Sequence, residues 1–369
     1  MKICFVQSNC GSHTERFLRK MEVKHEVHFV SLKDIPVDFC KQHPLVSFYA
    51  FNLSLPGFFS IKSFLTLIRG TILLKQIIKK IKPDILFGGW IQTDGFICAL
   101  ANYHPFLLMP WGSDVLIYPF MNIFLKKGSN WVINRADKIT CDAEHVKKTI
   151  ADLSKRNLED ISVIPWGVEL DIFNSTIQGF NLRAQLGWRD NIILIMTRSF
   201  EPVYNVSTFL NVLPSLCKEF SDLRVILCGT GSLNNDFRNF IRSHGLEEVV
   251  HFPGFVPRDS LPFYYAAADI YISSSISDGT SLSLLEAMAM GLPVIVSEIP
   301  AILEWVKHDY NGYVFPSQNE EALKSCIKQL IVDLKLRKKF SRMNKQITLR
   351  RANWDDNYKK LESLFQELV

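Results

Sequence analysis

The chain has 369 residues, which exceeds the usual size of a single hydrophobic core and predicts two domains of ordinary size. Apolar residues make up 47% and charged residues 21%, a globular composition that excludes long disordered stretches. The net charge of +5 is spread along the chain, which argues against a nucleic-acid partner and leaves a phosphate-bearing small molecule or an anionic membrane surface open.

The N-terminal run "MKICFVQ" predicts a strand, because its apolar part is too short for a signal peptide. The eight cysteines include no C-x-x-C pair and lie in apolar contexts, so we expect reduced core residues of a cytoplasmic protein. No stretch reaches about 18 uncharged apolar residues, and a transmembrane helix is not indicated.

Short apolar runs alternate with helix-length segments along the whole chain. The first half contains "KICFVQ", "HEVHFVSL", "DILFGG", "FLLMP", "KITCD" and "SVIPWG", and the second half contains "NIILIMT", "RVILCG", "VVHFPGF", "DIYISSS", "PVIVS" and "GYVFP". Such alternation is typical of parallel sheets buried on both faces. It predicts an α/β fold of two doubly wound domains facing each other across a cleft, joined by a linker at about residues 170–190, with ligands beyond the carboxyl ends of the strands.

Residues 48–84 are apolar but interrupted by lysine and arginine. We expect one or two helices facing the core, and the alternative is a surface that rests on anionic lipid. The last segment, "ANWDDNYKKLESLFQELV", predicts an amphipathic helix with Trp354, Tyr358, Leu361 and Phe365 on one face.

The stretch "SDGTSLSLLEAMAMGLPVIVS", residues 277–297, has two acids with seven residues between them. It predicts a loop that leads into a helix N-terminus, whose unpaired N–H groups suit a phosphate, and Gly279 lets the backbone approach closely. Glu286 could accept hydrogen bonds from a vicinal diol such as a ribose, and Asp278 could accept hydroxyls on the other side of the phosphates. A structural explanation also fits, since Ser283 and Glu286 have the spacing of a capping box and Asp278 suits a turn.

Residues 278–316 resemble the donor-site signature of family 4 retaining glycosyltransferases, in which an acid, seven residues and a glutamate in an EAMA-type helix precede G-x-P-V. Further segments lie in the family's order: "DILFGGWIQTDGF", "PWGSDVL", "RADKITCDAEHVKKTI", "ISVIPWGVELDIF", "RVILCGTGSL" and "VVHFPGFVPRDSLPFYYAAADIYISSS". The resemblance is weakest at residues 35–80. It implies the GT-B fold, with an acceptor-binding domain over residues 1–175, a donor-binding domain over 185–351 and a closing helix, 352–369, that returns to the first domain.

The resemblance also implies roles for particular residues. Glu286 would hold the donor ribose, Asp278 would contact the sugar or the phosphate, and Arg198 would bind the diphosphate. The remaining positions implied in donor binding are Gly11, Gly254, Phe255, Gly279, Thr280, Ser281 and Leu282. The candidate catalytic residues are Asp114, Arg198 and Asp278.

Three positions depart from the family pattern. Asp278 stands where a glutamate is usual, so its side chain is one methylene shorter. No lysine follows Arg198, where the chain reads Val203-Tyr204-Asn205, and losing a charge-assisted hydrogen bond of roughly 1.5–3 kcal/mol weakens phosphate binding by about one to two orders of magnitude. Trp111 replaces a histidine in "PWGSD", which makes Asp114 the candidate for contacting the acceptor or sugar, with a turn or helix cap as the alternative.

The resemblance implies that a sugar moves from a nucleoside-diphosphate donor to a glycan or lipid-linked glycan acceptor with retention at the anomeric carbon, in polysaccharide or glycolipid biosynthesis. No cofactor or metal is expected, because no DxD pair or His/Cys cluster occurs and Arg198 with the helix N-terminus would neutralise the diphosphate. The enzyme would be cytoplasmic, with peripheral contact to the inner face of an anionic membrane. Two alternatives stay open: a non-catalytic nucleotide-sugar binding protein with this fold, and a GT-B sugar epimerase.

Overall fold

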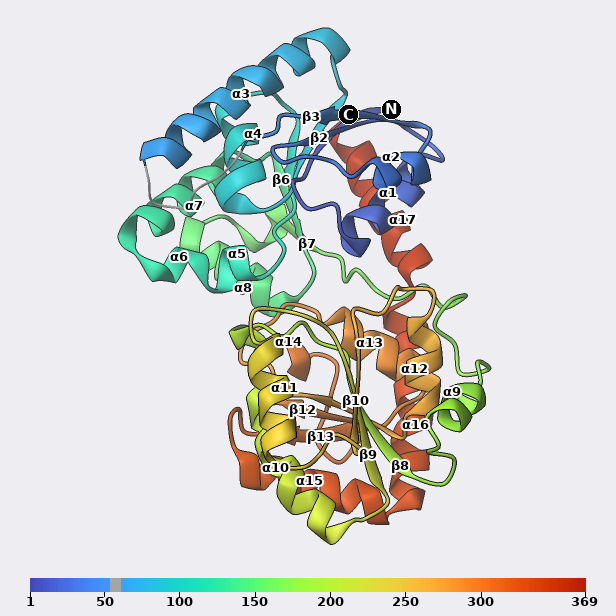
Figure 1. The fold of residues 1–369 in the computed structure, drawn as a ribbon. Helices are drawn as coiled ribbons and strands as arrows, with labels where there is room; N and C mark the ends of the chain where they lie inside the picture. Colours follow the sequence, from blue (N-terminus) through green and yellow to red (C-terminus); the bar gives the residue numbers. More distant parts are fainter. Residues whose placement is uncertain (54–60) are drawn as a thin grey trace. The chain divides into compact units, whose positions relative to one another are not determined.

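The computed structural model describes residues 1–53 and 61–369, and the chain divides into two compact units (Figure 1). The first unit comprises Met1–Ile164 and Tyr358–Val369, and the second comprises Pro165–Asn357. Each unit contains one parallel sheet with helices packed on it. The prediction of two doubly wound domains is therefore confirmed.

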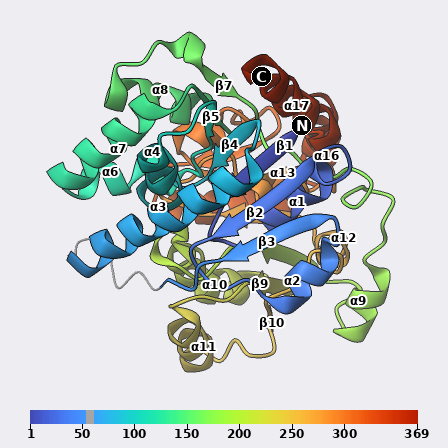
Figure 2. The ribbon, with the colours of Figure 1, turned by 90° about the horizontal axis from the view of Figure 1, so that it is seen from above.

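The first unit has a seven-stranded sheet in the order β3-β2-β1-β4-β5-β6-β7. Its strands are β1 (Lys2–Val6), β2 (Glu26–Ser31), β3 (Val46–Ala50), β4 (Ile85–Gly88), β5 (Phe106–Leu108), β6 (Lys138–Cys141) and β7 (Ile161–Val163). The chain builds outward from β1 to β3 and then returns to place β4 on the other side of β1 (Figure 2). The strand order thus reverses between β1 and β4, which is where doubly wound sheets bind ligands.

Helices connect these parallel strands, as parallel pairing requires. They are α1 (Ser12–Met21), α2 (Val37–Gln42), α3 (Ile61–Ile81), the π-helical turn η1 (Ile91–Gly95), α4 (Phe96–Ala101), α5 (Ser113–Leu116), α6 (Tyr118–Met121), α7 (Ile123–Arg135), α8 (Glu144–Ser154) and the short η2 (Leu158–Asp160). Aromatic rings fill the centre of this unit: Phe5 stacks on Phe87 with centroids 4.8 Å apart, and Phe365 packs against Phe87.

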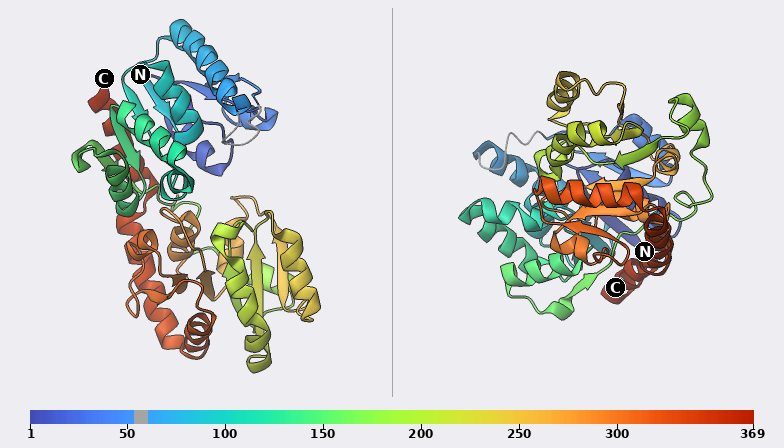
Figure 3. Two further views of the ribbon diagram at one scale, coloured as in Figure 1. Left: turned by 90° about the vertical axis from the view of Figure 1, so that its left-hand side faces the viewer. Right: turned by 90° about the horizontal axis from the view of Figure 1, so that it is seen from below.

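The second unit has a six-stranded sheet in the order β10-β9-β8-β11-β12-β13. Its strands are β8 (Ile192–Met196), β9 (Leu223–Cys228), β10 (Val250–Gly254), β11 (Ile270–Ser273), β12 (Val294–Ser297) and β13 (Gly312–Phe315). Its helices are α9 (Phe180–Gln185), η3 (Pro202–Tyr204), α10 (Val206–Glu219), α11 (Asn234–Ser243), α12 (Leu261–Ala267), α13 (Leu282–Ala289), α14 (Pro300–Leu303), α15 (Glu320–Val332) and α16 (Leu334–Arg351). They cover both faces of the sheet (Figure 3), and here the strand order reverses between β8 and β11.

The C-terminal helix α17 (Trp354–Leu368) confirms the predicted amphipathic segment. All four residues of the predicted apolar face are buried: Trp354, Tyr358, Leu361 and Phe365. The boundary between the units falls inside this helix, after Asn357.

All twelve strand-like runs become strands, but the sequence analysis missed the edge strand β3. The prediction of helix from residue 48 is therefore wrong at residues 48–50, where Phe48 packs edge-on against Phe29 of the neighbouring strand. The helical part begins at Ile61 and forms the single helix α3, while residues 54–60 lie outside the described residues. Among the described helices, none combines the length and the hydropathy that a membrane span needs.

The segment expected to link the two domains packs onto the second unit instead. The division falls between Ile164 and Pro165, earlier than the expected 170–190. The Val168 amide donates to the Ala352 carbonyl at 2.6 Å, and Phe173 is fully buried. The segment therefore packs into the core of the second unit.

None of the eight cysteines, all within the described residues, forms a disulfide. Cys10, Cys40 and Cys217 are partly exposed, and the other five are buried.

Candidate functional site

The loops that follow β8 and β11 bring the charged residues of the second unit together. Arg198 follows β8 and Asp278 follows β11, at the position where the strand order reverses. The Arg198 Nη2 donates to the Asp278 carboxylate, and its Nη1 donates to the hydroxyls of Ser281 at 2.7 Å and Ser283 at 3.0 Å. We call these residues, with Tyr204, Tyr265 and Glu286, the Arg198 network.

Arg198 is a buried cation, with 7% of its surface exposed. Burial lowers the pKa of its guanidinium, but the Asp278 carboxylate together with Tyr204 and Tyr271 outweighs burial, and the net pKa is raised. Burial raises the pKa of Asp278, and Arg198 offsets part of that rise. The Tyr204 ring lies 4.1 Å from the Arg198 guanidinium carbon, which makes a cation–π contact. Tyr204 lies in the segment where the family pattern has a lysine and this chain has none.

Helix α13 carries the predicted phosphate-binding end. It begins after Ser281, whose hydroxyl accepts a long 3.4 Å hydrogen bond from the Leu284 amide, so the N-cap is Ser281 and not Ser283 as the capping-box alternative required. Gly291 ends the helix with φ +82°, as expected for a helix-terminating glycine.

Glu286, one turn inside α13, is held by a tyrosine. The Tyr265 hydroxyl lies 3.0 Å from Glu286 Oε2, 3.1 Å from the Ser283 carbonyl and 2.7 Å from Thr197 Oγ1. Burial and then the Glu286 carboxylate raise the pKa of Tyr265 well above its ordinary value, so the hydroxyl remains a proton donor. This orients the Glu286 carboxylate within the Arg198 network.

The structure brings some predicted residues together and leaves others apart. Arg198, Asp278 and Ser281 are in direct contact, and Glu286 joins them through Tyr265. Gly279, Thr280 and Leu282 lie on the same loop and first turn, and Thr280 Oγ1 accepts from the Trp305 indole at 3.4 Å.

Gly254 is the last residue of β10 and Phe255 follows it, two strands away from β8. The Gly254 carbonyl accepts from the Gly229 amide, and a side chain at Gly229 would lie 2.1 Å from the Arg198 carbonyl oxygen. This glycine therefore allows the β9 loop to pass against the Arg198 loop. Phe255 is 74% exposed.

Gly11 and Asp114 belong to the first unit. Gly11 precedes α1 and its amide donates to Asn9 Oδ1. Asp114 is fully buried, and its two carboxylate oxygens accept from the amides of Trp111 at 2.8 Å and Ile91 at 3.0 Å. These bonds fix the Trp111 loop to the turn after β4.

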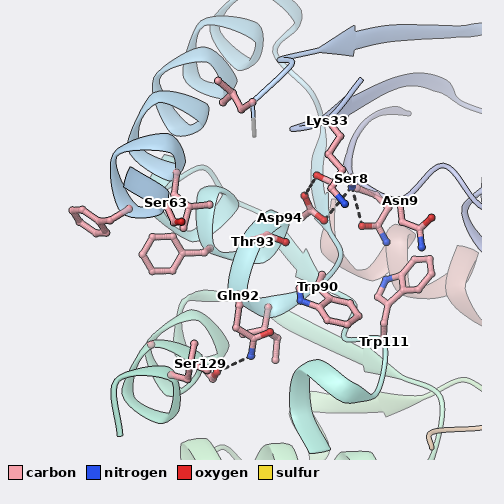
Figure 4. Close-up of a pocket in the computed structure, with 18 of the residues that line it drawn as sticks. Ser8, Asn9, Lys33, Ser63, Trp90, Gln92, Thr93, Asp94, Trp111 and Ser129 are labelled. Atoms are coloured by element: carbon pink, nitrogen blue, oxygen red, sulfur yellow. Dashed lines mark hydrogen bonds between the residues drawn. The ribbon is translucent and has the colours of Figure 1, made fainter. Parts of the chain in front are cut away.

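The first unit contains a cavity of about 1100 Å³ at the carboxyl ends of β1, β2 and β4 (Figure 4). It is lined by Gln7, Ser8, Asn9, Cys10, Lys33, Leu53, Ser63, Phe64, Leu67, Trp90, Ile91, Gln92, Thr93, Asp94, Phe96, Trp111, Phe124, Leu125, Gly128 and Ser129. The strand order reverses between β1 and β4, so the cavity lies at this sheet's topological switch point.

Asp94 is the buried carboxylate of this first-unit cavity. The Ser8 hydroxyl donates to its Oδ1, and the Ser8 amide donates to its Oδ2 at 3.1 Å. Burial raises the pKa of Asp94 to about 6, with the Ser8 hydrogen bonds acting against the rise. Burial likewise raises the pKa of Asp114 to about 6. Among the described residues, no three His, Cys, Asp or Glu side chains gather as a metal site.

Sequence reasoning missed several residues of these two sites. Tyr265 in the second unit, and Ser8 and Asp94 in the first, were not singled out. Tyr204 was noted only as a position without a cation. Asp94 lies in the quoted segment "DILFGGWIQTDGF", where an acid in the turn that follows a buried strand was the available signal.

Comparison with known proteins covers both units. The family model described as glycosyl transferases group 1 matches residues 180–347, and the model described as glycosyl transferase 4-like matches residues 2–143. The alpha-monoglucosyldiacylglycerol synthase of Streptococcus pneumoniae is 27% identical, over 72% of this chain and 63% of its own length. An alpha-1,3-galactosyltransferase from Escherichia coli, named for UDP-Gal and alpha-D-GlcNAc-diphosphoundecaprenol, is 27% identical over 67% of this chain and 66% of its length.

A solved structure has the same fold. The Anabaena protein HepE, in complex with UDP-glucose, superposes with a TM-score of 0.83 over all of both chains at 17% identity. The chain spans less than two thirds of the length of the curated relatives described above.

Two Rossmann-like units and these matches define the GT-B fold class. The chain belongs to the group 1 glycosyltransferases, of the family 4 type.

Proposed function

We propose that this protein transfers a sugar from a nucleoside-diphosphate-sugar to a hydroxyl acceptor. The observation that carries the proposal is the buried Arg198, which faces the N-terminus of α13 and the Asp278 carboxylate at the switch point of the second unit. A fixed cation and a helix N-terminus are suited to the two charges of a diphosphate. The second unit is thus proposed to bind the donor.

The charged residues of the Arg198 network have proposed parts in the reaction. Arg198 and the α13 backbone at Thr280, Ser281 and Leu282 would bind the diphosphate and stabilise the negative charge that develops as it leaves. Glu286, held by Tyr265, would accept hydrogen bonds from the ribose hydroxyls. Asp278 would contact the sugar or the phosphate once the donor competes for Arg198.

Three finer features belong to the same proposal. Transfer would retain the anomeric configuration, as the family 4 type suggests, and it would need no metal because Arg198 supplies the positive charge. Gly11 would approach the diphosphate from the first unit, while Gly254 and Phe255 would contact the base.

The acceptor is proposed to bind the first unit, whose cavity at the β1–β4 switch point supports this assignment. A glycan or lipid-linked glycan is the proposed acceptor, in glycolipid or polysaccharide synthesis, since relatives are named for such products. The protein would act in the cytoplasm with peripheral contact to an anionic membrane, and the five cations of α3 support that contact: Lys62, Arg69, Lys75, Lys79 and Lys80.

A thermal-shift screen tests the donor assignment. The protein is heated with UDP, GDP, ADP and their common sugar conjugates, and the screen is repeated with Glu286→Ala. A ligand at 100 times its dissociation constant stabilises the folded protein by about 2.7 kcal/mol, so one nucleotide should raise the melting temperature of the parent and not of the variant. No shift with any nucleotide, or an equal shift in the variant, would overturn the assignment.

Turnover separates transfer from simple binding. Release of the nucleotide should depend on an added acceptor. Tight binding without release over hours would instead favour the non-catalytic nucleotide-sugar binding protein, and sugar isomerisation without an acceptor would favour an epimerase.

A further inference from the structure

The first-unit cavity changes in character from one end to the other. Ser8, Asn9, Lys33 and Asp94 gather on one side of it, and Ser63 and Ser129 lie on the other (Figure 4). That other side is formed by helices α3 and α7, which also contribute four apolar side chains to the lining: Phe64, Leu67, Phe124 and Leu125. The cavity therefore has a polar end at the strands and an apolar end between two helices.

The polar end suits an uncharged head that carries hydroxyl groups. A carboxylate has about four acceptor positions, and Ser8 occupies two on Asp94. The Ser8 hydroxyl in turn accepts from the Leu32 amide at 3.1 Å, which fixes its orientation. A carboxylate accepts hydrogen bonds from sugar hydroxyls, and Lys33 on the same side balances its charge. This end therefore has no net positive charge to attract an anion, and a neutral sugar fits it better.

The apolar end opens onto the protein surface. Phe64 is 54% exposed and Phe124 is 79% exposed, although both line the cavity. More exposed apolar side chains lie beside them on the same two segments: Leu65, Ile72, Phe120, Met121 and Ile123. Exposing such a cluster of apolar side chains to water is unfavourable, so the cluster marks a contact surface.

The two chain segments that carry this apolar surface have charges of one sign. The sequence has no aspartate or glutamate between Asp38 and Asp84, where seven lysines and arginines occur, or between Asp114 and Asp137, where three occur. Exposed apolar residues among cations, without acids, complement a bilayer of anionic lipid. A soluble protein partner would not require this single sign of charge.

We propose that this cavity binds the acceptor as an amphiphile drawn from an anionic bilayer, with its neutral sugar head at Ser8 and Asp94 and its hydrocarbon chain between Phe64 and Phe124. The volume of about 1100 Å³ is at the upper end for small-molecule pockets, so it accommodates a sugar together with part of a chain. That the bound amphiphile is the acceptor rests on the proposed function. The binding itself does not, because the cavity and the exposed apolar residues beside it belong to the first unit alone.

Calorimetric titration of the full chain with alkyl glycosides tests the proposal. Methyl, hexyl and octyl glucosides are compared below their critical micelle concentrations. Affinity should rise by about two- to fourfold for each methylene that enters the apolar end. The double variant Phe64→Ser/Phe124→Ser should lose this dependence on chain length, and the matched control Leu349→Ser, on an exposed apolar residue of α16, should keep it.

The head is tested with octyl phosphate, which has the same chain and a charged end. The parent should bind octyl glucoside at least tenfold more tightly than octyl phosphate, and Asp94→Asn should reduce that preference. Equal binding of methyl and octyl glucosides, an unchanged chain dependence in the double variant, or a preference for octyl phosphate would each overturn the proposal.

The bilayer is tested by co-sedimentation with phosphatidylglycerol and phosphatidylcholine vesicles at low salt. The parent should sediment with the anionic vesicles and much less with the neutral ones, and the double variant should sediment with neither. Equal sedimentation with both lipids would overturn the anionic part of the proposal. The nucleotide thermal shift is the separate readout of the proposed function. If a nucleotide still stabilises the protein but the alkyl glycosides do not bind, only this inference is wrong. If the glycosides bind but no nucleotide stabilises the protein, the proposed function is wrong.

Discussion

The two sites differ in how they manage charge. The Arg198 network holds a buried cation against a carboxylate and two hydroxyls, with an aromatic ring against the guanidinium. The first-unit cavity instead surrounds a space of about 1100 Å³ and keeps the carboxylate of Asp94 at one end. A prearranged set of charges suits a ligand of fixed charge such as a diphosphate, whereas a graded cavity suits a ligand recognised by shape and polarity.

Removing the cation should have the largest effect. Arg198→Ala leaves Asp278 as a buried, unpaired charge, so we expect the free energy of unfolding to fall by about 3–5 kcal/mol and nucleotide binding to be lost. Denaturant titration measures the first and the thermal shift the second. Lys328→Ala, which removes an exposed ion pair with Glu219, should change stability by less than about 1 kcal/mol.

A double variant sharpens this prediction. Adding Asp278→Ala to Arg198→Ala removes the unpaired carboxylate, so part of the lost stability should return while nucleotide binding stays absent. If Arg198→Ala proves no more destabilising than Lys328→Ala, the account of a buried, charge-balanced network is wrong.

The first-unit carboxylate should make stability depend on pH. Because burial raises the folded-state pKa of Asp94 to about 6, the stability linked to its proton is fully present below the unfolded pKa of about 4 and is lost as pH rises through about 6. The difference between the folded and unfolded pKa of Asp94 corresponds to a change in the free energy of unfolding on the order of 3 kcal/mol. Asp94→Asn should remove this part of the decline, measured by urea unfolding between pH 4 and 7.5.

Asp38→Asn, on an exposed carboxylate of the same unit, is the control and should leave the pH profile as in the parent. Asp114, whose pKa burial also raises to about 6, contributes a decline of the same sign to every variant. Identical profiles for the parent and Asp94→Asn would contradict the prediction.

The cations beside the apolar end of the cavity should contribute to membrane binding. Lys126 and Lys127 are exposed beside Phe124, and each basic residue near an anionic membrane contributes about 1 kcal/mol. Lys126→Ala/Lys127→Ala should therefore weaken partitioning into phosphatidylglycerol vesicles by about tenfold or more at low salt, and the difference should shrink at high salt. Lys335→Ala/Lys338→Ala on α16 should have no comparable effect, and a loss of equal size there would indicate non-specific attraction.

The smallest effect is expected at Tyr204. Tyr204→Leu removes the ring 4.1 Å from the Arg198 guanidinium carbon and keeps an apolar side chain of moderate size. A cation–π contact of this kind contributes about 0.5–2 kcal/mol, so nucleotide affinity should fall by roughly two- to thirtyfold by calorimetry. Tyr204→Phe keeps the ring and should bind as the parent does; a loss as large as that of leucine would assign the effect to the hydroxyl.

The sequence predicted the parallel-sheet architecture and the charged part of the Arg198 network, for physical reasons. Continuously apolar strands follow from burial on both faces, and Asp278 and Glu286 lie within one short segment whose helix start is encoded locally. Arg198 was placed by a resemblance, because nothing local to "MTRSFEP" indicates that it meets a loop 80 residues further on.

The remainder depends on tertiary packing. Strand β3 lies at the sheet edge and has a partly exposed pattern, so apolar periodicity gave it no clear signal. Tyr265 reaches Glu286 from another helix, and the cavity forms because α3 and α7 lie beside the loops after β1 and β4. Ser8 and Asp94 are 86 residues apart, and no pattern along the chain pairs them.

The position of Cys10 in the cavity lining offers a chemical handle on the first unit. Burial, followed by the neighbouring Cys40 and Asp34, raises its pKa to about 11, so roughly one thiol in ten thousand is ionised at pH 7. Alkylation should be slow there and should accelerate about tenfold with each pH unit up to the pKa. In a Cys40→Ser/Cys217→Ser background, which removes the other partly exposed thiols, the labelling rate at pH 9 would report whether the cavity is empty or occupied.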